Sequence, residues 1–216
     1  FLFGPSSFGA DWPIWGRDGS RNMVSSETGL IVDFKPGDVN DDEVVDMKTT
    51  KNVKWVAKLG SQAYGNVTVG QGKVFVGTNN ESPRDPGKKG DRGVVMCLDE
   101  KSGELLWQLV IPKLGAGKVS DWEYIGVCSS AAIDGNKVYV VTNRCEVVCL
   151  DINGLADGNS GPYKDEAKYI RPKGKQDELN VKTDADIIWM YDMRDQLGVF
   201  PHNVTSSSAV VVGDVV

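Results

Sequence analysis

The sequence predicts an all-β fold, a β-propeller built from four-stranded antiparallel blades. One observation is a repeated strand–turn–strand segment, which occurs at residues 66–79 and 130–143 and begins again at 208–216. A second is that each complete copy is followed by another apolar strand and then by a tryptophan, Trp107 or Trp189. A third is the presence of 25 glycines against 9 prolines, a composition that favours tight turns over long helices.

The repeat defines units of four strands, A to D, joined by hairpins. Within a partial propeller domain at 11–216 we expect part of a blade at 11–60, full blades at 61–112 and 124–193, and the start of another at 204–216. Trp55 is predicted to lie in the last strand of the incomplete first unit. A single unit leaves an apolar face uncovered, and radial repetition covers it. A β-sandwich or an open array of the same units remains an alternative, because spacing alone does not exclude either.

Two insertions interrupt the units. One, around residues 81–92, lies between strands B and C of the first blade and is rich in Pro, Gly and charged residues. The other, roughly residues 153–185, lies between strands C and D of the second blade and contains several glycines and prolines. Both compositions predict irregular excursions from the sheet.

Composition and charge weigh against some classes of function. The net charge is −6, and no basic patch offsets it, which argues against a nucleic-acid partner. No apolar run reaches the roughly 18 residues that a membrane-spanning helix needs. Residues 1–10 are apolar or small and uncharged, like the tail of a secretory signal peptide with a cleavage site near Gly9-Ala10. We therefore expect an exported protein, periplasmic or extracellular, although an ordinary apolar arm has the same composition.

The four cysteines fit either an oxidising or a reducing compartment. Cys145 and Cys149 lie on one strand, roughly 13 Å apart, too far for a disulfide within that strand. There is no Cys-x-x-Cys pair, so no metal site is predicted. Cys97 and Cys149 hold equivalent places of the repeat, where a small apolar side chain is wanted.

Residues 97–107, Cys-Leu-Asp-Glu-Lys-Ser-Gly-Glu-Leu-Leu-Trp, resemble the tryptophan-docking motif of PQQ-type (quinoprotein-type) propeller repeats. Asp99, Gly103 and Trp107 match the motif, and Asp151 and Trp189 match it in the second copy, where the insertion removes the Ser-Gly turn. The opening Asp-Trp-Pro-Ile-Trp-Gly-Arg-Asp-Gly-Ser-Arg at 11–21 adds to the resemblance. The chain is therefore identified as a fragment of an exported, bacterial PQQ-like repeat protein.

Each motif residue has a physical role of its own. Asp99 can accept backbone N–H bonds across the turn between strands C and D. Gly103 can supply the positive φ that a bulged hairpin requires. Trp107 can bury its ring between blades while its indole N–H finds an acceptor. These roles account for the fold and carry no catalysis.

The resemblance implies a functional face formed by the D–A and B–C loops. We expect that face to bind a protein or carbohydrate partner, as a binding or scaffold module, since the family includes the barrel-assembly lipoprotein of outer membranes. The candidate residues in these loops are Tyr64, Asn79, Arg84, Trp122, Glu123, Arg144 and His202. For Trp122, Glu123, Arg144 and His202, a local packing or surface role is the alternative.

Two other functions remain open. The family also contains dehydrogenases that use PQQ and calcium to oxidise alcohols or sugars, with a carboxylate as base. Their adjacent cysteine pair and a c-type haem motif are both absent from this sequence, which weighs against an enzyme. A degenerate propeller module within a larger multidomain protein is the third hypothesis. The sequence assigns no catalytic residue, cofactor, blade number or oligomeric state.

Overall fold

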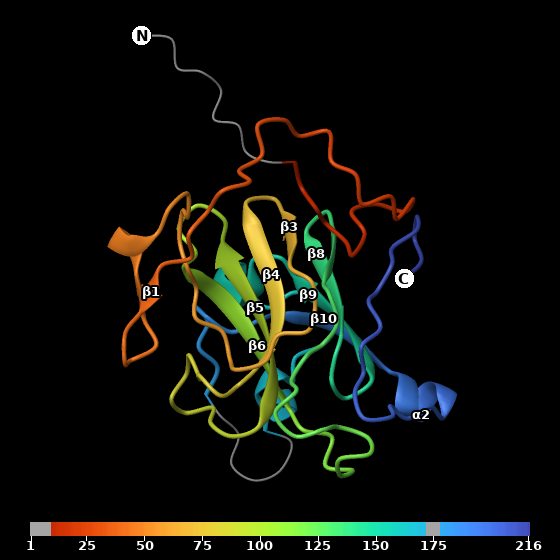
Figure 1. The fold of residues 1–216 in the computed structure, drawn as a ribbon. Coiled ribbons are helices and arrows are strands. Elements are labelled where there is room, and N and C mark those ends of the chain that lie inside the picture. Colours follow the sequence, from red (N-terminus) through yellow and green to blue (C-terminus); the bar gives the residue numbers. More distant parts are fainter. Residues whose placement is uncertain (1–9, 172–177) are drawn as a thin grey trace.

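A computed structural model describes residues 10–171 and 178–216. The segment interpreted as a signal-peptide remnant lies, except for Ala10, outside the described residues. Two four-stranded antiparallel sheets make up most of the regular structure and stand side by side, with few and short helices (Figure 1). This confirms the predicted all-β fold of four-stranded antiparallel units.

Each sheet runs in simple chain order. The first sheet has the order β3-β4-β5-β6, with β3 (Thr68–Gly70), β4 (Lys73–Asn79), β5 (Arg92–Asp99) and β6 (Leu105–Pro112). The second has the order β10-β9-β8-β7, with β7 (Ala132–Asp134), β8 (Lys137–Val141), β9 (Glu146–Asp151) and β10 (Ile187–Asp192). Strands A to D of the two units are therefore β3 to β6 and β7 to β10.

The turn between strands A and B recurs at equivalent positions of all three repeats. Gly70 pairs with Lys73 in the first sheet, and Asp134 pairs with Lys137 in the second. In the third copy, Val212 and Val215 form an isolated antiparallel bridge around Gly213. The hairpin turn therefore forms at the equivalent place in each of the three copies.

The remaining elements are small. They are β1 (Asp38–Val39), β2 (Val45–Asp46), η1 (Met47–Thr49), η2 (Gly154–Asp157), α1 (Glu166–Ile170) and α2 (Met193–Leu197). Residues 11–60 hold only β1, β2, η1 and two isolated bridges. Trp55 was expected in a strand, but residues 52–67 form no ladder with any described residue. Trp55 packs instead against a second apolar cluster of the first sheet, which includes Val74 and Met96.

The main core lies between the two sheets. Phe75, Val95 and Trp107 from the first sheet pack in one cluster with Val138 and Ile187 from the second. Their neighbours in sequence point to the opposite face, because side chains alternate along a strand. The buried apolar faces of the two units are thus covered by each other, as successive blades require.

Two tryptophans make the same contact at two successive places. The indole nitrogen of Trp55 donates to the carbonyl of Glu100, and that of Trp107 donates to the carbonyl of Ile152, both at 2.9 Å. Each acceptor directly follows the last residue of a strand C, Asp99 or Asp151.

A glycine lies against each of these rings. Gly103 has φ +74°, and a Cβ there would come within 2.5 Å of the Trp55 ring. Gly154 has φ +63°, and a Cβ there would come within 2.9 Å of the Trp107 ring. The insertion was expected to leave the second unit without its Ser-Gly turn. In the structure, Gly154 at the start of η2 provides the open space instead.

The second unit's insertion covers the outer edge of the first sheet. Gln108 in β6 donates its backbone N–H to Thr183 and accepts one from Ala185, which forms a parallel bridge at Asp184. Asp184 also forms a buried ion pair with Lys88, from the first unit's insertion. An open sheet edge invites pairing with other chains. The two insertions therefore close this part of the edge and join the two units.

Candidate functional site

The B–C and D–A loops share one end of the sheets. The register pairs Asn79 with Gly93 and Arg92 with Pro112, so β4 ends, β5 begins and β6 ends at the same level. In the second sheet, Val141 pairs with Val147 and Asp192 with Glu146. The connecting loops gather at the lower end in Figure 1, which we call the loop end.

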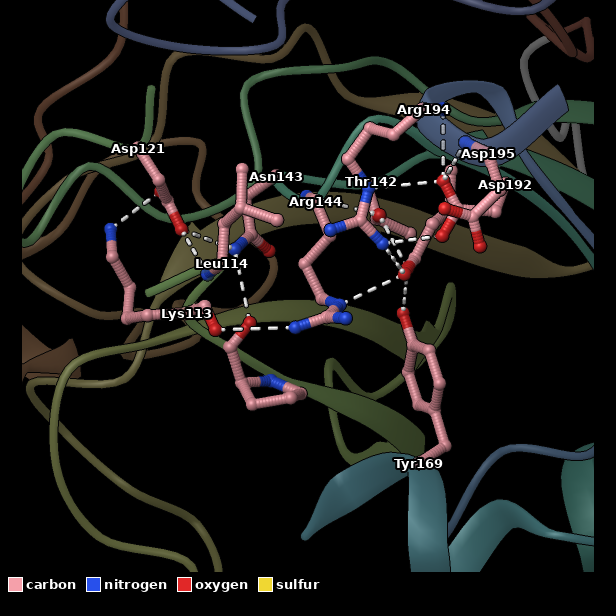
Figure 2. A network of polar contacts seen from close by, with 12 residues as sticks. Lys113, Leu114, Asp121, Thr142, Asn143, Arg144, Tyr169, Asp192, Arg194 and Asp195 are labelled. Carbon is pink, nitrogen blue, oxygen red and sulfur yellow. Dashed lines mark hydrogen bonds and ion pairs between the residues drawn. The ribbon is translucent and has the colours of Figure 1, made fainter. Parts of the chain in front are cut away.

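A buried carboxylate organises the loop end of the second sheet (Figure 2). Glu146, at the start of β9, accepts hydrogen bonds from Arg144 Nε at 2.9 Å and from Arg194 at 3.2 Å. It also accepts from the Tyr169 hydroxyl at 2.7 Å and from Thr142 Oγ1 at 3.1 Å. Burying a charge is tolerated when it is paired and hydrogen-bonded, as here.

The network ties two distant segments, α1 and α2, to the B–C turn. Arg194 lies in α2, whose first turn is capped by Asp192. Tyr169 lies in α1, within the long insertion. Burial, together with the neighbouring Glu146 charge, raises the pKa of Tyr169 well above its usual value, so the phenol stays a donor. Glu146 therefore fixes α1, α2 and the turn at Arg144 relative to one another.

A second polar cluster fixes the D–A loop that joins the two sheets (Figure 2). Lys113 Nζ lies 2.6 Å from Asp121 Oδ1 and donates to the carbonyl of Trp122 at 2.6 Å. Asp121 also accepts from the Leu114 backbone N–H at 2.8 Å and from Asn143 Nδ2 at 3.1 Å. The loop is thus held to the B–C turn of the next unit.

The D–A loops that follow β6 and β10 lie side by side. The backbone N–H of Trp122 donates to the carbonyl of Asn203 at 2.7 Å, and Asn203 N–H donates to Val119. Large apolar side chains on these loops are nevertheless exposed. They are Val119, Trp122 and Tyr124 on one loop and Leu197, Val199 and Phe200 in α2 and the segment after it, and we call them the apolar loop patch.

The structure distributes the predicted site residues over several places. Asn79 is buried, and its side chain binds the segment around Ser61. Its Nδ2 lies 3.0 Å from Ser61 Oγ, and its Oδ1 accepts from Ser61 N–H at 3.0 Å. Arg84 donates to the carbonyl of Lys58 on the surface. Arg144 belongs to the Glu146 network. Its guanidinium binds Glu146 and the carbonyl of Lys113.

The others are more accessible. Trp122 lies under the Lys118 ammonium, 5.7 Å from its ring centroid, and Glu123 pairs with Lys118 at 3.0 Å. His202 is exposed, in an isolated bridge with Val204. Tyr64 lines a cavity elsewhere, so the structure brings Trp122, Glu123 and His202 to adjoining loops and leaves Tyr64 apart.

That cavity, of about 470 Å³, is lined by residues that sequence reasoning missed, including Trp15, Arg21, Asn66 and Ser206. The repeat alignment could have indicated this cavity, since Asn66, Ser130 and Ser208 occupy equivalent positions of the three copies and all line it. No carboxylate lines the cavity, and no group of three or more His, Cys, Asp or Glu suited to a metal occurs among the described residues. The residues that line this cavity do not fit a calcium ion with PQQ, because calcium takes several oxygen ligands, carboxylates above all.

A family model of PQQ-type repeats, described as outer membrane protein assembly factor BamB, matches residues 20–154 and 91–216. The chain belongs to this family. No match was found among curated proteins. Within the described part of this family member, no helix has the length and apolar character needed to cross a membrane.

Proposed function

We propose that this chain is an exported binding module of the cell envelope, which holds a protein partner on its loop end. The observation that carries the proposal is the apolar loop patch, exposed on loops that the Glu146 and Asp121 networks fix in place. Exposed aromatic and aliphatic side chains gathered on one surface are typical of protein-binding sites. Fixed loops lose little entropy when they bind, which favours affinity.

The family supports the same proposal. The description of its model names a factor in the assembly of outer membrane proteins. We expect such a factor to contact other proteins. Membership of such a family supports export to the periplasm or the outer membrane, and the apolar, uncharged composition of residues 1–10 supports it too.

In-cell photocrosslinking tests this proposal. A photoreactive phenylalanine analogue is placed at Trp122 or at Phe200 in the full-length protein in its native host. The matched control places it at Asn136, which is exposed in the A–B turn of the second sheet, at the opposite end. We expect discrete adducts with the same envelope protein from both loop positions and none from Asn136. Equal adducts from all three positions, or none from either loop position, would contradict the proposal.

Cell fractionation checks the export. The full-length protein is expected with the envelope fractions, protected from added protease in intact cells and degraded once the outer membrane is opened. A protein found only with cytoplasmic markers would exclude a role in the envelope.

A further inference from the structure

The cavity at the start of strands A is built from equivalent positions of the repeat. Its lining combines two sets of three, one residue from each repeat: Tyr64, Cys128 and Ser206, and two residues later Asn66, Ser130 and Ser208. Residues two apart on an extended chain point to the same side. Each unit therefore contributes the same pair of positions to one cavity of about 470 Å³, within the range of about 300–1,000 Å³ of small-molecule sites.

Several polar groups on this wall have no partner in the protein. Across the described residues, the Tyr64 hydroxyl, the Asn66 amide and the Ser206 hydroxyl form no hydrogen bond. The Ser208 hydroxyl accepts from the Ser130 backbone N–H at 3.0 Å and keeps its own proton to donate. Donors and acceptors on three successive units are thus available to a ligand with several hydroxyl groups.

An aromatic ring and a cation complete the lining. Trp15 and Arg21 come from an N-terminal segment that is anchored to both sheets, through Trp12 with Val69 and through the Pro13 carbonyl with Ile133 N–H. The Arg21 guanidinium lies 5.1 Å from the Trp15 ring centroid and donates to the Trp15 carbonyl. It forms no ion pair with any described residue, and it is the one charged side chain in the lining.

We propose that this cavity binds an acidic saccharide, a sugar with a carboxylate on its ring. The faces of Trp15 and Tyr64, both exposed in part, can pack on the apolar C–H face of a sugar. The serine hydroxyls and the Asn66 amide match sugar hydroxyls. The Arg21 guanidinium offers a carboxylate charge-assisted hydrogen bonds, and no carboxylate in the lining opposes it. The proposal stands on a different surface from the apolar loop patch and does not depend on it.

Titration calorimetry with the full-length protein tests it. The probes are oligosaccharides of glucuronate, galacturonate and mannuronate, each compared with its methyl ester, which keeps the sugar and removes the charge. We expect at least one acid to bind with a dissociation constant below about 1 mM and its ester to bind about tenfold or more weakly, since hydrogen bonds to charged groups are the stronger ones. No binding of any acid, or equal binding of acid and ester, would overturn the proposal.

Variants assign the binding to the cavity. Arg21→Gln is expected to weaken binding of the acid about tenfold and to leave the ester unchanged. Arg17→Gln, a nearby arginine outside the lining, is the matched control and is expected to bind as the wild type does. Binding of inorganic phosphate as tight as the acid would show a simple anion site and overturn the saccharide. Trp122→Ala is expected to bind the acid normally, which separates this test from that of the loop end.

Discussion

The indole nitrogen of Trp107 donates a hydrogen bond to the carbonyl of Ile152 at 2.9 Å, across the boundary between the two sheets. The donor lies in strand D of one unit and the acceptor directly after strand C of the next. Because the ring is fully buried, neither polar group has access to water as a substitute partner. This contact therefore holds the last strand of one unit against the next unit.

Replacing Trp107 with Phe is expected to destabilise the protein by about 1–3 kcal/mol beyond the lost volume, because the Ile152 carbonyl is left buried without a partner. Urea unfolding followed by circular dichroism measures the change. Trp122→Phe is the control, since Trp122 is exposed and its change is expected to stay within about 0.5 kcal/mol. Equal effects of the two variants would contradict a structural role for the indole N–H.

Replacing Gly154 with Ala is expected to cost more than replacing Gly135 with Ala. Both glycines have positive φ, +63° and +54°. An alanine at either position is therefore expected to lower the free energy of unfolding by about 1–2 kcal/mol. A Cβ at Gly154 would also lie 2.9 Å from the Trp107 ring, whereas at Gly135 nothing lies within 4 Å. Overpacking of this kind adds about 1–3 kcal/mol, which comparison of the two unfolding free energies isolates.

The Lys88–Asp184 pair is expected to behave as a buried ion pair. Lys88→Met leaves Asp184 charged and buried, at a cost of about 3–5 kcal/mol, and adding Asp184→Asn is expected to restore part of the loss. Lys118→Met breaks an exposed pair with Glu123 and is expected to cost at most about 1 kcal/mol. A double variant no more stable than Lys88→Met would show that the unpaired Asp184 charge does not cause the loss of stability.

The cysteines are expected to react slowly with iodoacetamide at pH 8. Burial raises the pKa of the Cys97 thiol to about 12 and that of Cys128 to about 11, so the reactive thiolate is scarce. Cys128 lines the cavity, and its rate is expected to rise about tenfold per pH unit up to about pH 11, since the thiolate fraction does. Mass spectrometry of native and urea-unfolded protein measures each site, and rapid native labelling of Cys97 would contradict its burial.

Local sequence accounts for the parts of the structure that local chemistry controls. The alternation of apolar residues gave the strands, and Gly-containing dipeptides gave the A–B turns, even in the third copy around Gly213. The contacts of Asp99 also follow from its neighbours, since its carboxylate accepts N–H bonds from Lys101 and Ser102 at 2.9 and 2.8 Å. The hydrogen bonds from Ser102 lower the pKa of Asp99, because they stabilise its charged form.

Sequence reasoning failed where distant segments meet. The role of Gly154 was missed because its spacing from Asp151 differs from that in the first copy. The extended residues around Trp55 were read as a paired strand, but a strand needs a neighbour, and no described residue supplies one. The Glu146 network was missed for the same reason, because Tyr169 and Arg194 are remote from it in the chain.

The sequence by itself determined the repeated four-stranded unit, since strand alternation, turn glycines and the spacing of Trp107 are all local properties. Only the tertiary structure decided which side chains meet. It separated Tyr64 from the other candidates, placed it with Trp15 and Arg21 in a cavity, and left the apolar loop patch exposed. The reason is physical: a hydrogen bond or a cavity wall depends on distances in space, and loops and insertions set those distances without leaving a period in the sequence.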